Sequence, residues 1–137
     1  MKKIVSTKNA PSAIGAYSQG VIVDGGVQIH NNQPKLVFTA GQIPLDPKTG
    51  EMRNDTIEEA TEQVLKNVRG VLEAAGSRME NVIKTTVFLQ DMSEFAGMNE
   101  VYSRFFSENP PARSAVQAAA LPKGSRVEIE AIATVSM

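Results

Sequence analysis

The chain has 137 residues, with 14 lysines and arginines against 15 aspartates and glutamates and a formal net charge of −1. This length suits one domain over residues 1–137, and the balanced charge without basic runs argues against nucleic-acid binding. The absence of cysteine and the single histidine, His30, which we expect at the surface, exclude thiolate catalysis, disulfides and the usual zinc sites.

The N-terminal segment MKKIVSTKNAPSAIG carries two lysines and then only a short apolar run. This run is far shorter than the apolar core of a signal peptide, and no other segment approaches a membrane span. We therefore expect a soluble, cytoplasmic protein.

The first two predicted strands flank two turns. Residues 20–23 form the first strand, and VDGGV and HNNQPK, at residues 23–27 and 30–35, are typical of turns. The second strand, residues 36–40, lies in KLVFTAG and is apolar on both sides. This composition predicts that both faces of its sheet are buried.

The segment NDTIEEATEQVLKNVRGVLEAAG, residues 54–76, predicts a helix because its apolar residues recur at three- and four-residue steps. Thr56 and Glu59 form a capping box at its start, and Gly76 can adopt the left-handed conformation that ends it. The apolar face consists of Ile57, Ala60, Val64, Val68, Leu72 and Ala75.

A second helix is predicted over SEFAGMNEVYSRFF, residues 93–106, with Ser93 as its N-cap. Asn99 lies beside the apolar stripe of this helix, where its amide would need hydrogen-bond partners if buried. It is either a structural amide or the polar lip of a pocket. The apolar stripe consists of Phe95, Met98, Tyr102, Phe105 and Phe106.

Three further strands are predicted at residues 82–90, 114–118 and 126–135. In the last strand apolar and polar residues alternate, so Glu128 and Glu130 point to the same face. The order of elements favours an α+β sandwich in which both helices cover one face of a mixed sheet. Exposure of the second face to water would cost burial free energy, so we expect self-association and a ligand cleft between subunits. The apolar side of the last strand consists of Val127, Ile129, Ala131, Ala133 and Val135.

The most distinctive charged residues are Arg113, Glu128 and Glu130, which lie in otherwise apolar sequence. Arg113 follows two prolines that fix the direction of the chain, and its guanidinium suits a bidentate contact with a carboxylate. It is equally compatible with an ordinary ion pair, for which Glu128 is the candidate partner. Glu128 can also be a solvated strand residue, and Glu130 is better explained as a surface partner of Arg126.

Two residues outside the helices are further candidates. Tyr17 follows the flexible Gly15 and offers a phenol, although a tyrosine beside a strand is more often a packing residue. Gly41 would let a backbone amide approach a ligand closely, or it simply turns the chain.

Four segments together resemble the RidA/YjgF family of reactive intermediate deaminases from end to end. They are SAIGAYSQG, FTAGQIPLDPKTGEM, VFLQDMSEFAGMNEVYSRFF and PPARSAVQAAALPKGSRVEIEAIA. The last segment is the most specific, because an Ala-Arg pair, a Leu-Pro-Lys-Gly turn and an alternating Glu strand occur in it together. The resemblance implies a chorismate-mutase-like α+β fold, assembled as a homotrimer around a β-barrel-like core with three sites at the subunit interfaces.

The resemblance also implies an activity in metabolite damage control, the hydrolysis of 2-iminobutanoate and 2-iminopropanoate to 2-oxo acids and ammonia. Arg113 would bind the substrate carboxylate, and Glu128, facing the same crevice, would position and activate water. The backbone of Ala115 would help to place that water or the imine nitrogen. An imine is already electrophilic, so this chemistry needs no metal or cofactor. The pocket would be lined by Tyr17, Gly41 and Asn99, some of them from a neighbouring subunit.

The sequence departs from the family pattern at three alanines. Ala115 stands where many members have cysteine, Ala40 where serine is frequent, and Ala16 where proline usually precedes the tyrosine. Because Ala115 keeps the backbone carbonyl, we expect function to survive. The segment at residues 25–34 is longer than the family norm and is either a decoration or a cover over the interface that alters substrate size preference.

Two alternatives differ in class from a deaminase. A non-catalytic trimer would bind small carboxylates or 2-oxo acids through Arg113 and act as a regulatory module. Glu128 separates the two hypotheses, because a nearby anion helps to activate water and does not help to bind a carboxylate. A ribonuclease or translation inhibitor is disfavoured by the balanced charge and the lack of a histidine pair.

Overall fold

The computed structural model describes residues 2–23 and 35–135. The extended segment at residues 25–34, His30 and most of the two predicted turns lie outside the described residues.

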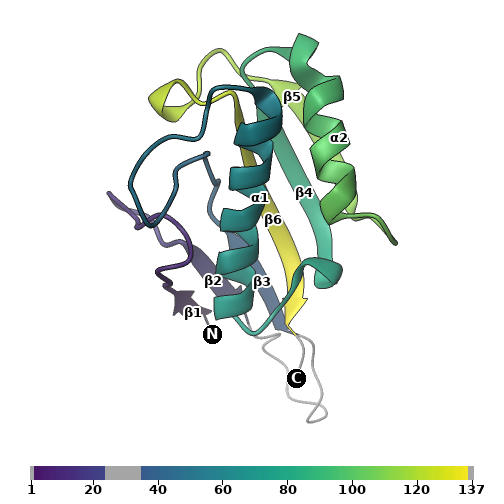
Figure 1. The fold of residues 1–137 in the computed structure, drawn as a ribbon. Coiled ribbons are helices and arrows are strands. Elements are labelled where there is room, and N and C mark those ends of the chain that lie inside the picture. The colour runs from purple at the N-terminus through teal and green to yellow at the C-terminus, as the bar shows by residue number, and fades with distance from the viewer. Residues whose placement is uncertain (1, 24–34, 136–137) are drawn as a thin grey trace.

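The strands form one six-stranded mixed sheet in the order β1-β2-β3-β6-β4-β5 (Figure 1). Neighbouring strands are antiparallel except β4 and β5, which are parallel and are connected through the second helix. The five predicted strands are present, and their ends differ from the prediction by no more than two residues. The strands are β1 (Lys2–Val5), β2 (Gly20–Val23), β3 (Lys35–Thr39), β4 (Val82–Leu89), β5 (Ala112–Gln117) and β6 (Val127–Val135).

Strand β1 was not predicted from the sequence. It lies at the edge of the sheet and pairs with β2, with Lys2 opposite Val23 and Val5 opposite Gly20. Only Val5 of its four residues is buried. A short edge strand with one buried side chain has no alternating pattern for sequence analysis to detect.

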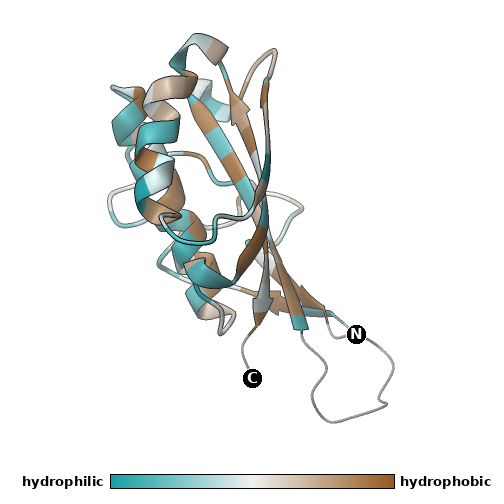
Figure 2. Ribbon diagram, turned by 90° about the vertical axis from the view of Figure 1, so that its right-hand side faces the viewer, coloured by the Kyte–Doolittle hydropathy of each residue, from teal (hydrophilic) through white to brown (hydrophobic). Residues whose placement is uncertain are grey.

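Two α-helices, α1 (Ile57–Ala74) and α2 (Phe95–Phe105), lie side by side on one face of the sheet (Figures 1 and 2). Their arrangement confirms the predicted α+β architecture with both helices on one face. Short 3-10 turns at Met79–Asn81, Met92–Glu94 and Pro122–Gly124 lie in the connections. The core between the helices and the sheet includes fully buried Leu65, Leu72, Met98 and Ile129.

Both ends of α1 are stabilised as the sequence predicted. The Thr56 hydroxyl accepts a hydrogen bond from the Glu59 amide at 3.1 Å. At the other end Gly76 has φ of 81°, and the Ser77 amide donates to the Leu72 carbonyl at 2.8 Å. This is a Schellman motif, which requires a left-handed residue at the glycine position.

The predicted cap of α2 is wrong. Ser93 lies inside the 3-10 turn before the helix, and the Asp91 carboxylate accepts a hydrogen bond from the Ser93 amide at 2.9 Å. Asp91 therefore caps the turn, and no side chain caps α2 itself. On the predicted apolar stripe, Met98, Tyr102 and Phe106 are buried, whereas Phe95 and Phe105 are only partly buried; Val101 is buried as well.

The alternation predicted in β6 separates the two faces of the sheet. Val127, Ile129, Ala131 and Ala133 are buried beneath the helices. The residues between them point to the opposite face, which we call the open face because no described element covers it (Figure 2). Phe38 and Val116 point to this face and are 39% and 47% exposed. Among the described residues, no helix is long and apolar enough to cross a membrane.

Candidate active site

A cavity of about 480 Å³ lies beside Glu128, on the open face of β6. It contains three of the six site residues predicted from the sequence, which we call the Glu128 half-site: Tyr17, Gly41 and Glu128. Most other residues of its wall are apolar, so Glu128 is the single carboxylate in a largely apolar lining. The remaining lining residues are Ile14, Ala40, Ile43, Pro122 and Lys123.

Gly41 lies against Glu128 because the chain after β3 pairs with β6. The Gln42 amide donates to the Ile129 carbonyl at 2.9 Å, and the Ile129 amide donates back at 3.1 Å. A Cβ atom at Gly41 would overlap Oε1 of Glu128 and would lie 3.0 Å from its Cδ. A side chain at position 41 would therefore displace the Glu128 carboxylate from the position it occupies.

The pKa of the Glu128 carboxyl is raised above its ordinary value. Burial is the main cause, because it disfavours the charged form, and the nearby charge of Glu130 adds to it. Among the described residues, no cation forms an ion pair with Glu128. The carboxyl is consequently a stronger proton acceptor than a fully solvated glutamate.

The loop that carries Tyr17 is held by Gln19, a residue that sequence analysis did not single out. The buried Gln19 side chain donates to the carbonyls of Thr7, Ala10 and Pro11 at 2.9, 3.1 and 2.7 Å, and its Oε1 accepts from the Thr7 amide at 2.6 Å. These bonds fold residues 7–19 back on themselves beside the cavity. The only sequence signal was a polar amide directly before an apolar strand.

Arg113 lies on the other face of the sheet, against α2. Its Nη1 donates to Oδ1 of Asn99 at 2.7 Å, and its guanidinium carbon lies 4.6 and 5.3 Å from the ring centroids of Tyr102 and Phe95. The Tyr102 hydroxyl is hydrogen-bonded to the Thr85 hydroxyl at 2.7 Å, and burial raises the pKa of Tyr102. Two aromatic rings and one amide thus fix the direction of the arginine.

No carboxylate of the described residues forms an ion pair with Arg113. The expected alternative, a pair with Glu128, is therefore not formed within the chain. Ala115 lies two residues further along β5 on the same face and packs against the core. Asn99, Arg113 and Ala115 form the second group of predicted site residues, which we call the Arg113 half-site.

The structure divides the predicted crevice between two faces of one chain. Strand register places Arg113 beside Thr85, and Thr85 opposite the buried Ala131, all on the helix side. Glu128 pairs with Phe88 and points to the open face. Within one chain the two side chains therefore diverge, and Arg113 does not line the cavity beside Glu128.

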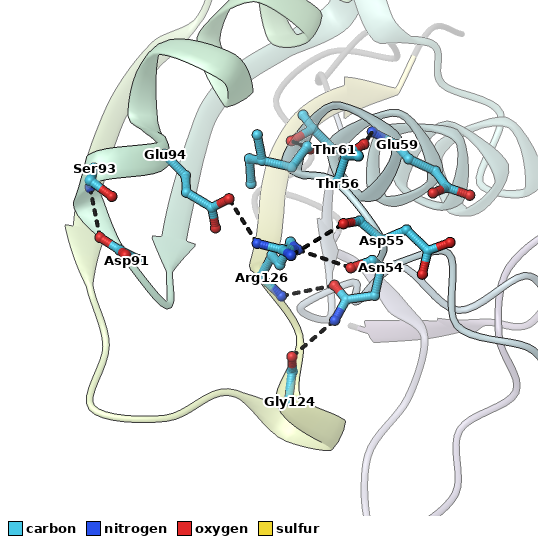
Figure 3. Close-up of polar contacts among 11 residues, drawn as sticks. Asn54, Asp55, Thr56, Glu59, Thr61, Asp91, Ser93, Glu94, Gly124 and Arg126 are labelled. Atoms are coloured by element: carbon cyan, nitrogen blue, oxygen red, sulfur yellow. Dashed lines mark hydrogen bonds and ion pairs between the residues drawn. The ribbon is translucent and has the colours of Figure 1, made fainter.

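Arg126 was expected to pair with Glu130, and this expectation is wrong. Its Nη1 binds Oε2 of Glu94 at 2.8 Å, and its Nε and Nη2 donate to the carbonyls of Asn54 and Asp55 at 2.9 and 3.2 Å (Figure 3). The side chain reaches the helix ends because Arg126 precedes β6 and does not follow its alternation. It anchors the start of the strand that carries Glu128. Glu130 is exposed and forms no ion pair with a described residue.

Among the described residues, there is no group of three or more His, Asp or Glu side chains arranged to hold a metal ion.

The chain belongs to the family described as Endoribonuclease L-PSP, whose model matches residues 7–135. It is a RidA/YjgF-type protein, as the four sequence segments indicated. A RutC family protein of Pyrococcus horikoshii is 49% identical over 133 residues, which cover 97% of this chain and 98% of that one. The 2-iminobutanoate/2-iminopropanoate deaminase of Rattus norvegicus is 47% identical over 133 residues, covering 97% and 90%. The crystal structure of E. coli TdcF with bound serine matches with a TM-score of 0.84 and 45% identity, over 98% of this chain and 99% of TdcF.

Proposed function

We propose that this protein hydrolyses short 2-imino acids, such as 2-iminobutanoate and 2-iminopropanoate, to 2-oxo acids and ammonia. The observation that carries the proposal is the pair of preformed half-sites. One displays a fixed guanidinium that pairs with no carboxylate of residues 2–23 and 35–135, and the other displays a carboxyl of raised pKa in a largely apolar cavity. The rat relative of 47% identity is named for this activity.

The division of the site between two faces leads us to propose assembly as a ring. A neighbouring copy would bring its Arg113 half-site to the Glu128 half-site of the first. Such a contact joins two different surfaces, so it can repeat around a closed ring. We propose three copies, a homotrimer, because the resemblance to the RidA/YjgF family implies this number. The open face, with exposed Phe38 and Val116, supplies apolar area for the contact.

In the proposed reaction Arg113 binds the substrate carboxylate with its remaining N–H groups, since Asn99 occupies one of them. The protonated imine then lies with C2 towards Glu128. Glu128 accepts a proton as a water oxygen forms its bond to C2, which gives a neutral carbinolamine. Glu128 then returns this proton to the nitrogen, and the C–N bond breaks as the oxygen forms its double bond to C2. The hydroxyl proton passes to the departing ammonia, so the products are the 2-oxo acid and ammonium. Tyr17, Gly41 and the Ala115 backbone would line the space around the substrate.

The alternative is a trimer that binds 2-oxo acids and regulates a partner without catalysis. A Lactococcus lactis relative of 48% identity, named as a regulator, supports this alternative. The uncompensated Glu128 argues for catalysis, because a carboxylate ligand would be held more weakly beside a second carboxylate.

The two functions are distinguished by generating 2-iminobutanoate in solution and following its loss in the presence of a trapping amine. We compare the wild type with Arg113→Ala and Glu128→Ala. The arginine variant should lose binding and turnover together, whereas the glutamate variant should keep 2-oxobutanoate binding and lose turnover. Equal activity of all three proteins contradicts the deaminase, and 2-oxobutanoate binding without any turnover by the wild type supports the binding module.

A further inference from the structure

The turn Pro122–Gly124 at the edge of the Glu128 half-site has an unusual backbone. Lys123 has φ of 55° and ψ of 28°, in the left-handed region, and Gly124 follows with φ of 64°. A side chain with a Cβ is disfavoured in this region, which glycine and asparagine occupy more readily. A strained residue beside a site suggests that its side chain has a function there.

Lys123 lines the cavity that contains Glu128, and among the residues that the structure describes it is the only cationic one in that lining. No hydrogen bond or ion pair links its ammonium to another described residue. Lys123 is exposed, and its ammonium is not neutralised by Glu128 or by another described carboxylate.

The carboxylates near the Glu128 half-site repel an anionic substrate, and the positive charge of Lys123 can offset part of this repulsion. Glu128 and Glu130 both point to the open face, so an anionic 2-imino acid that approaches this cavity meets two carboxylates. Within one chain Arg113 lies on the other face of the sheet and cannot offset them, and in the proposed ring the Arg113 of the neighbouring copy brings one positive charge against two carboxylates. A cation in the wall of the cavity reduces this repulsion.

We propose that Lys123 is a substrate-binding residue that attracts the carboxylate of the 2-imino acid to the Glu128 half-site. This inference rests on the proposed function. The role of Lys123 differs from that of Arg113. Arg113 holds the carboxylate of the bound substrate, whereas Lys123 attracts the anionic substrate to the cavity and favours it over uncharged analogues.

The test measures the dissociation constant of 2-oxobutanoate, a carboxylate that is not consumed, by titration calorimetry. Lys123→Gln removes the charge, and Lys66→Gln removes one positive charge from the exposed side of α1 as the matched control. Lys123→Gln should raise Kd about 3- to 10-fold at low salt, as expected for one partly screened charge, and the difference should shrink in about 0.5 M NaCl. The uncharged amide of the same acid should bind Lys123→Gln and the wild type alike.

A second variant separates binding from folding. Lys123→Asn suits the left-handed backbone, so its Tm should not fall below that of the wild type while its Kd rises as in Lys123→Gln. Equal Kd values for Lys123→Gln and Lys66→Gln overturn the inference, as does a wild type that fails to bind 2-oxobutanoate. If 2-oxobutanoate binds and depends on Lys123 but imines are not hydrolysed, the proposed deaminase fails and the role of Lys123 stands.

Discussion

Substitution of Gly41 by alanine probes the position of the Glu128 carboxylate with a single methyl group. The added Cβ would overlap Oε1 of Glu128 and come within 3.0 and 3.1 Å of its Cδ and Cγ. The backbone of Gly41 is not in the left-handed region, so alanine causes no strain of its own. The carboxylate must instead move by roughly 1 Å, and a misplacement of that size costs about 100-fold in rate when the group acts directly on the substrate.

The assay measures kcat and KM for 2-iminobutanoate together with thermal unfolding of the same samples. We expect kcat to fall about 100-fold while the free energy of unfolding changes by less than about 0.5 kcal/mol, because Gly41 is exposed and the end of the Glu128 side chain is free to rotate. Gly97→Ala is the matched control. Its added Cβ would lie 2.6 Å from Cγ2 of Ile57, between the two helices. This variant should therefore lower the stability and leave the kcat of each folded molecule unchanged. Retention of kcat within twofold by Gly41→Ala would refute a role for Glu128 at its observed position.

Two further predictions concern the remaining parts of the site. Tyr102→Leu removes the ring that lies 4.6 Å from the Arg113 guanidinium and should raise KM about tenfold. Tyr102→Phe keeps the ring but loses the hydrogen bond to Thr85, so it should cost about 1 kcal/mol of stability and leave KM nearly unchanged. Similar KM values for both variants would show that the ring does not position the arginine. Glu128→Gln should be more stable than the wild type at pH 7, since the raised pKa means that the folded chain binds the proton more tightly than the unfolded chain and loses stability as Glu128 ionises. The gain should fade as the pH falls below the ordinary glutamate value of 4.5, and thermal unfolding between about pH 4 and 8 measures it; a gain that persists in acid contradicts the assignment to Glu128.

Local patterns were sufficient to predict most of the fold. Helix α1 could be located with its caps because a capping threonine, an apolar face and a terminal glycine all occur within one continuous segment. The burial of Ile129 and its neighbours followed from strict alternation in β6. Strand β1 was missed because Val5 is its only buried residue. The predicted cap of α2 was wrong because Asp91 and Ser93 are both good capping residues, and the backbone uses Asp91 to cap the 3-10 turn that precedes the helix.

The candidate site was harder to predict because its residues come from different strands. Alternation fixes which residues of one strand share a face, but the relation between β5 and β6 depends on strand register, which the sequence does not reveal. The opposite orientations of Arg113 and Glu128 could therefore not be foreseen. Arg126 lies just outside β6, so the alternation rule assigned its side chain to the wrong partner. The Gln19 side chain donates hydrogen bonds to three backbone carbonyls, and no sequence motif predicts such contacts.

Subunit mixing tests most directly whether the site forms between copies of the chain. Arg113→Ala and Glu128→Ala, each inactive alone, are co-expressed with different tags, and assemblies that carry both tags are purified and assayed with 2-iminobutanoate. In a trimeric ring that pairs the arginine of one copy with the glutamate of the next, every doubly tagged assembly has both residues intact in one of its three sites, so about one third of the wild-type activity should return. Doubly tagged assemblies with no activity above that of the single variants would contradict the account.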